Sequence, residues 1–331
     1  MPQDPVHNLT NPYLPDDVYI PDGEPHVYGD RVYLYGSHDL DGTCFPCEGD
    51  YQCWSASVDD LTKWRNEGTI YHRLQDPFIY DHRNDLRPFN KYLFAPDVVH
   101  VGDYWYLFYG VGMSGSGIGV AVAKAPAGYF NYLGRVHYPD QQPLGYGRPL
   151  FKTPLGIPIF HKKGYPYDPA VLYDQGHLYL YFGYGHCYVA ELSTIDMRLL
   201  IEMPEFDSYV SPDLLADNHS PWRMQNASSI RKVKGRYYLT YYAKNGKNNA
   251  LCYAIADSPL GPFHYEGVLI SLGNGGAFGN DEGTAYQGNT HGGMFEINGR
   301  YFQSYHRQTG GKYPDRQACL TELVMDENGH F

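Results

Sequence analysis

The sequence predicts an all-β protein, a single five-bladed β-propeller over residues 1–331 with a pocket on its central axis. The composition is 16% aromatic and only 19% charged, with 34 Tyr, 37 Gly and 24 Pro, which is typical of short strands joined by tight turns. One hairpin pattern occurs five times along the chain. Polar residues precede every copy of this hairpin, so a propeller would gather them at one place.

The repeated hairpin is a short polar turn containing glycine, followed by a tyrosine-rich alternating strand. Each copy is followed by a second strand pair, which gives about four strands per unit, the content of one propeller blade. A β-sandwich with coincidental hairpins is the alternative, and the recurrence of the pattern disfavours it. The five turn glycines are Gly29, Gly102, Gly176, Gly235 and Gly299.

The last unit ends at "LVMDENGHF", where Asn-Gly signals a turn without a returning strand. Two explanations remain open. Either the N-terminal stretch completes the last blade, or a further C-terminal domain is absent from this chain.

The net charge of −12 argues against nucleic acid as a partner, because binding to phosphates requires a basic face. No apolar run approaches the length of a membrane span, and the N-terminus lacks the features of a signal peptide. We therefore expect a soluble protein without membrane contact, either cytoplasmic or secreted with its signal removed.

The residues before each hairpin are rich in carboxylates, amides and histidine, and the blades should bring them together at the axis. Carboxylates on two sides of a sugar are what glycoside hydrolysis requires: a base that activates water and an acid that protonates the leaving oxygen. A third carboxylate would keep the acid protonated by like-charge repulsion. Tyr and Trp rings would pack on sugar faces. The residues are Asp22, Glu24 and His26, then Asp97, then Asp168, then Gln225, Asn226, Ser229 and Arg231, and finally Asp281, Glu282 and His291.

The motifs "YIPDGEPHVYGDRVYLYGSHD", "FAPDVV", "YDPAVLYD", "ASSIRKVKGRYYLTYYA" and "GNTHGGMFEINGRYFQSYHRQ" resemble glycoside hydrolase family 43, from Asn11 to about Cys319. The resemblance implies a five-bladed propeller that releases terminal α-L-arabinofuranose or β-D-xylose from plant polysaccharides or oligosaccharides with inversion. No cofactor is required for this chemistry.

The resemblance also assigns roles to residues. It implies that Asp22 is the general base and that Asp97 raises the pKa of the acid and orients it. His291 matches a histidine that often binds calcium through water, which suggests a structural calcium ion there. Asp168 matches a structural position rather than a catalytic one. Glu24, Arg231, Glu282 and His306 are further candidates for substrate binding; His306 could equally cap its hairpin.

The sequence departs from the family pattern at the general acid. A gap-free match places Asn226 on the family's glutamate, and a slip of one residue would place Gln225 there. Neither amide can donate a proton as a carboxylic acid does. Three explanations compete: an engineered acid-to-amide change, a natural variant in which Glu282 or another carboxylate supplies the proton, or a catalytically silent sugar-binding protein.

Overall fold

The structure is a computed structural model. It describes residues 4–85, 88–111, 117–137, 144, 149–152, 158–160, 166–192, 214–215, 220–274, 284–286, 288–311 and 313–331.

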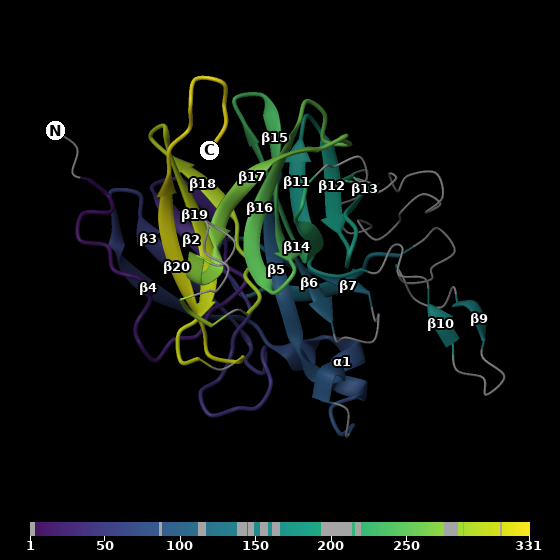
Figure 1. The fold of residues 1–331 in the computed structure, drawn as a ribbon. Helices are drawn as coiled ribbons and strands as arrows, with labels where there is room; N and C mark the ends of the chain where they lie inside the picture. Colours follow the sequence, from purple (N-terminus) through teal and green to yellow (C-terminus); the bar gives the residue numbers. More distant parts are fainter. Residues whose placement is uncertain are drawn as a thin grey trace.

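Five antiparallel sheets follow one another along the chain, each with its strands in sequence order, and they form the five blades of a propeller (Figure 1). The predicted fold class is thus confirmed. Among the described residues, blades 1, 2 and 4 have the expected four strands, and blades 3 and 5 have three. The blades are β1 (Glu24–Tyr28), β2 (Arg31–Tyr35), β3 (Tyr51–Ser57) and β4 (Asp60–Tyr71); β5 (Leu93–Val101), β6 (Tyr104–Val111), β7 (Ile118–Ala123) and β8 (Asn131–Arg135); β11 (Ala170–Asp174), β12 (His177–Phe182) and β13 (Tyr188–Leu192); β14 (Arg223–Val233), β15 (Arg236–Asn245), β16 (Asn248–Ala256) and β17 (His264–Ser271); and β18 (Met294–Ile297), β19 (Arg300–Gln308) and β20 (Arg316–Leu323).

The remaining elements are short and lie in the connections between strands. Asp76 caps α1 by accepting hydrogen bonds from the amides of Phe78 and Ile79. The described helices include none that is long and apolar enough to cross a membrane. These elements are η1 (Arg73–Gln75), α1 (Pro77–Asp81), η2 (Pro88–Lys91), η4 (Leu272–Asn274) and a separate hairpin of β9 (Pro149–Lys152) and β10 (Pro158–Phe160).

The five predicted turn glycines each lie between the first and second strand of a blade. All five have a positive φ, between 59° and 88°, a backbone conformation that glycine adopts without steric cost. The sequence therefore predicts these hairpins correctly because the turn chemistry is local.

The core consists mainly of apolar layers between neighbouring blades. Five clusters of buried residues each combine side chains from two adjacent sheets, including the pair formed by blade 5 and blade 1. Tyrosines such as Tyr35, Tyr109, Tyr181 and Tyr241 are fully buried in these layers. The tyrosine-rich strands thus supply large apolar surfaces that join one blade to the next.

The ring closes where the N-terminal segment meets the last blade. The amide of Tyr13 donates to the carbonyl of Ala318, and the Asn11 side chain exchanges two 2.8 Å hydrogen bonds with the backbone of Leu320. The N-terminal stretch therefore lies along β20, as the first of the two explanations expects. Figure 1 shows the N-terminal blade beside the C-terminal one.

Closer to the axis, the motif containing Gly292 and Gly293 joins blade 5 to blade 1. Gly23 and Gly292 form a parallel bridge, and the Gly293 amide donates to the Gly23 carbonyl at 2.9 Å. A Cβ on Gly293 would lie 2.2 Å from Glu24 Oε2 and 2.6 Å from Arg231 Nη2, so only glycine leaves room for this buried ion pair.

We expect Gly293→Ala to lower the free energy of unfolding by about 2 to 3 kcal/mol, because the added methyl group must displace the ion pair between Glu24 and Arg231. Urea unfolding measures the change. Gly267→Ala is the matched control, since its Cβ meets one ring carbon of Tyr253 at 3.3 Å, which can shift slightly. Equal stability of the two variants would contradict the packing argument.

Candidate active site

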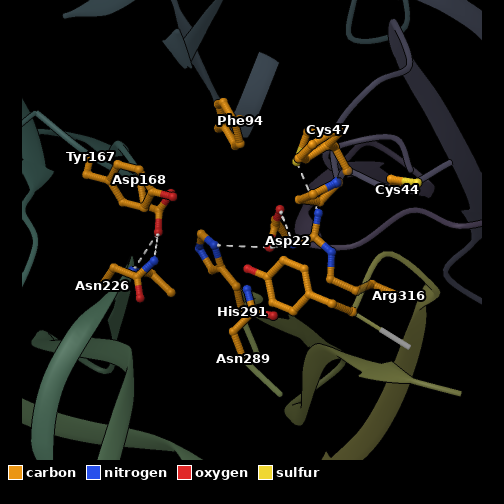
Figure 2. A pocket seen from close by; sticks show the side chains of 14 residues that line it. Asp22, Cys44, Cys47, Phe94, Tyr167, Asp168, Asn226, Asn289, His291 and Arg316 are labelled. Carbon is orange, nitrogen blue, oxygen red and sulfur yellow. Dashed lines mark hydrogen bonds and ion pairs between the residues drawn. The ribbon is translucent and has the colours of Figure 1, made fainter. Parts of the chain in front are cut away.

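The candidate site is a cavity of about 370 Å³, within the range of roughly 300 to 1,000 Å³ that is usual for ligand pockets (Figure 2). Its walls combine aromatic rings with a few polar groups, the pattern that sugar binding requires. The described lining residues are Asp22, Cys44, Phe45, Pro46, Cys47, Phe94, Tyr167, Asp168, Asn226, Ala227, Asn289, His291, Tyr313 and Arg316.

A repeated backbone feature occurs around this cavity, and three of its four residues line it. Four non-glycine residues with positive φ stand just before or at the bulged start of the first strand of blades 1 to 4: Asp22 (57°), Ala95 (33°), Asp168 (46°) and Ala227 (68°). Strained conformations of this kind cluster at functional sites. The register also shifts at this point in β5 and β14, as β-bulges do near active sites.

Asp22 is 5% exposed and is surrounded by cationic and hydrogen-bonding groups. Arg316 Nη1 lies 3.3 Å from both carboxylate oxygens. Burial raises the pKa of Asp22, but the charge of Arg316, together with His306, His291 and a hydrogen bond with Ser37, outweighs it and lowers the pKa to about 2. Asp22 is therefore an ionised carboxylate over the whole working pH range, as a general base must be.

Arg316 is itself fixed by a second carboxylate. Asp39 accepts two 2.7 Å hydrogen bonds from Arg316 Nε and Nη2 in a bidentate pair, and Nη2 also contacts Cys47 Sγ at 3.0 Å. This buried guanidinium was missed by the sequence analysis. The sequence "PDRQACL" offers only a charged residue at the start of an apolar strand as a signal.

Asp168 lies across the cavity from Asp22, next to Asn226, with His291 between the two sides (Figure 2). Its Oδ2 accepts hydrogen bonds from Asn226 Nδ2 at 2.7 Å and from the Ala227 amide at 2.9 Å. Burial raises the pKa of Asp168 to about 6, despite the lowering effect of His291. The expectation of a purely structural Asp168 needs correction, because the residue lines the cavity.

The structure distinguishes the two amides at the acid position. Asn226 is half-buried, lines the cavity and contacts Asp168. The side chain of Gln225 instead donates to the carbonyls of Arg223 and Met224 and is absent from the described lining of the cavity. Of the two amides, Asn226 therefore faces the cavity, and its match to the family's acid position stays a prediction.

Asp97 does not lie where the sequence analysis expected it. It is fully buried, and its carboxylate accepts from the amides of Val98 and Val171 and shares a 2.6 Å hydrogen bond with His26. Burial raises its pKa, but His26, Arg231 and the Val171 amide together outweigh burial and lower it. Asp97 lies two residues after Ala95, the positive-φ residue of its blade, just as Glu24 lies two residues after Asp22. Like Glu24, Asp97 is therefore buried beneath the cavity and does not line it. Asp168 takes the place beside the acid position.

Glu24 and Arg231 also lie below the cavity. Arg231 Nη2 contacts Glu24 Oε2 at 2.7 Å, and the Ser229 hydroxyl donates to the same oxygen at 2.9 Å. His306 is fully buried, and its Nδ1 accepts from the Asp22 amide. Burial lowers its pKa to about 3, so it is neutral. Glu24, Arg231 and His306 were predicted to bind substrate, but they are not among the described residues that line the cavity and instead pack beneath it. Glu282 lies outside the described residues.

His291 lines the cavity, and the calcium ion expected to bind it through water stays a prediction. Nε2 lies 3.5 Å from Glu24 Oε1, and Nδ1 lies 3.8 Å from Asp22 Oδ1. Burial lowers its pKa, but the nearby Glu24 carboxylate and the charges of Asp168 and Asp22 raise it to about 9, so the ring is a cation. Calcium takes six to eight oxygen ligands. Next to His291, the Glu24 carboxylate has one oxygen without a hydrogen bond, Oε1.

The sequence profile of Glycosyl hydrolases family 43 matches residues 9–331. This chain belongs to that family of propeller hydrolases.

Individual relatives agree with the family match. A "Xylosidase/arabinosidase" of Thermoclostridium stercorarium is 36% identical over 96% of this chain, which spans 65% of the length of that relative. A "Beta-xylosidase" of Xylanibacter ruminicola is 26% identical over 96% of this chain and 97% of its own length. Among solved structures, RS223-Beta-xylosidase is similar in fold with a TM-score of 0.68, at 21% identity over 95% of both chains.

Because burial disfavours its charge, Asp168 makes stability depend on pH. Its pKa is about 6 in the folded protein against 3.8 ordinarily, so its contribution is fully present below about pH 3.8 and lost as pH rises through 6. We expect Asp168→Asn to gain on the order of 2 to 3 kcal/mol relative to the parent between about pH 4 and pH 7.5. Urea unfolding at both pH values measures it.

The control for this measurement is Asp103→Asn, a change at an exposed turn residue between β5 and β6. Its stability should follow the parent at both pH values. A difference between Asp168→Asn and the parent that is independent of pH would show that Asp168 is already ionised in the folded protein at low pH.

Proposed function

We propose that this protein is an inverting glycoside hydrolase that releases terminal pentose units, α-L-arabinofuranose or β-D-xylose, from plant polysaccharides or oligosaccharides. The observation that carries the proposal is the pairing of a permanently ionised Asp22 with a protonatable Asp168 on opposite sides of one small cavity. Two carboxyl groups with pKa values pushed apart by their surroundings are the mark of an acid and base pair.

Asp22 would act as the general base. Its carboxylate accepts the proton of a water molecule as that water attacks the anomeric carbon, and the product sugar leaves with inverted configuration. Arg316 and the Asp22 backbone contact with His306 fix the carboxylate in place, so that it needs little reorganisation during the reaction.

The size and the lining of the cavity favour a single terminal sugar unit as the substrate. Phe45, Phe94, Tyr167 and Tyr313 provide apolar ring surfaces, while Asn289 provides a polar side chain for hydroxyl groups. The names of the relatives, xylosidase and arabinosidase, support pentoses as the sugar class.

Asn226 favours a second candidate function, the binding of sugar without cleavage. An amide stands where the family pattern has an acid. The hydrogen bond from Asn226 to Asp168 would then serve only to hold the shape of a sugar-binding pocket. Tight binding of xylose or arabinose oligosaccharides without any turnover would identify this function.

We expect the parent protein to hydrolyse an aryl α-L-arabinofuranoside or an aryl β-D-xyloside, with the inverted anomer as first product. Asp22→Asn should reduce the rate by about 10² to 10⁴, because it removes the base that activates water. Among the described residues that line the cavity, no second carboxylate is ionised at low pH to replace it. NMR of the anomeric proton during turnover measures both the rate and the stereochemistry.

Asp103→Asn again serves as the control and should retain the activity of the parent. A product of retained configuration would contradict single displacement. Full activity of Asp22→Asn would remove Asp22 from the mechanism.

A further inference from the structure

We infer that Asp168 is the proton donor of this protein, acting from beside Asn226 in place of the amidated acid position. The inference rests on the proposed function, because a proton donor has a role only if the glycosidic bond is cleaved.

The hydrogen bonds of Asp168 leave one oxygen available to the substrate. Asn226 Nδ2 and the Ala227 amide both donate to Oδ2. Two N–H donors on one oxygen exclude a proton from that oxygen, so the proton of the neutral acid resides on Oδ1. The described residues provide no hydrogen bond to Oδ1, and Asp168 lines the cavity. Asn226 thus directs the proton of its neighbour instead of supplying one.

The surroundings of Asp168 keep it protonated at mildly acidic pH. The residue is 4% exposed, and burial is the largest influence that raises its pKa to about 6. The titratable groups that face it are His291, which lowers the pKa, Asp22, which raises it, and the hydroxyls of Tyr167 and Tyr51. A general acid works best when its pKa lies near the working pH.

Other carboxyl groups near the axis are engaged in ion pairs or hydrogen bonds within the protein. Glu24 is held by Arg231 and Ser229, and Asp97 by His26 and two backbone amides. Among the described residues that line the cavity, the carboxyl groups belong to Asp22 and Asp168. Since Asp22 is ionised, Asp168 remains as the carboxyl donor. The His291 cation, with a pKa of about 9, gives up its proton less readily than Asp168, with a pKa of about 6.

The reaction balances with these two groups and one water molecule. The bond from the anomeric carbon to the glycosidic oxygen breaks, and its electron pair goes to the oxygen, which takes the proton from Asp168 Oδ1. Water forms the new bond to the anomeric carbon from the opposite side and gives its proton to Asp22. Proton exchange with solvent then restores a neutral Asp168 and an ionised Asp22.

The test compares two substrates that differ in their need for a proton. Dinitrophenyl β-D-xyloside has a leaving group that departs without protonation, whereas xylobiose has a sugar alkoxide that requires it. We expect Asp168→Asn to lower kcat/KM for xylobiose by about 10² to 10⁴ and to change the dinitrophenyl substrate by less than about tenfold. Asp22→Asn should lower both, because both need the activated water. The corresponding arabinofuranosyl pair replaces these substrates if the parent prefers that sugar.

A second variant separates proton donation from a structural role. In the Asp168→Asn background, Asn226→Glu should restore xylobiose hydrolysis at least about tenfold, because it returns a carboxylic acid to the same wall of the cavity. In the parent, kcat/KM for xylobiose should fall as pH rises above about 6, and this limb should be absent for the dinitrophenyl substrate.

The failures of the two proposals are distinguishable. A parent that hydrolyses neither substrate, of either sugar, overturns the proposed function and this inference with it. A parent that hydrolyses both substrates, with Asp168→Asn unchanged on xylobiose, overturns this inference alone. An equal loss on both substrates from Asp168→Asn, without rescue by Asn226→Glu, also overturns it, because it would assign Asp168 a structural role.

Discussion

The contact between the first and last blades is the constraint on which the site depends. The bridge of Gly23 with Gly292 and the alignment of the N-terminal segment with β20 bring residues from opposite ends of the chain together. Asp22 of blade 1 thereby meets Arg316 of blade 5, almost three hundred residues later. Without this closure, the base would lose the buried guanidinium that keeps it ionised, and the cavity would lose one wall.

The second organising feature is an asymmetry of charge across the cavity. The Asp22 side contains Arg316 and the neutral His306, while the Asp168 side contains the neutral amide of Asn226 and the backbone amide of Ala227. Both carboxyl groups are almost fully buried, so burial alone would raise both pKa values. Arg316 and, to a smaller extent, His306, His291 and Ser37 lower the pKa of Asp22 to about 2. At Asp168, burial outweighs the lowering by His291 and by the two hydrogen bonds, and the pKa is about 6.

The sequence predicts the fold well because its signals are local, but it predicts the site only in part. Turn glycines and alternating strands specify each hairpin wherever the blade lies. Asp97 and Asp168 both adjoin proline before or within a first strand, and nothing local shows which one faces the cavity. The positive-φ position of each blade decides it: Asp168 occupies this position in its own blade, whereas Ala95 occupies it in the blade of Asp97, which comes two residues later. Arg316 was missed because its partners Asp22 and Asp39 are distant in sequence.

The central claim is that Asp22 and Asp168 hold opposite protonation states in one cavity. The most direct test is an NMR titration of ¹³C-labelled aspartate carboxyl groups, assigned with Asp22→Asn and Asp168→Asn. The account predicts that the Asp168 resonance titrates near pH 6 while that of Asp22 stays ionised down to about pH 2. Titration of both residues together near their ordinary pKa, or an Asp168 that is ionised at about pH 4, would contradict it.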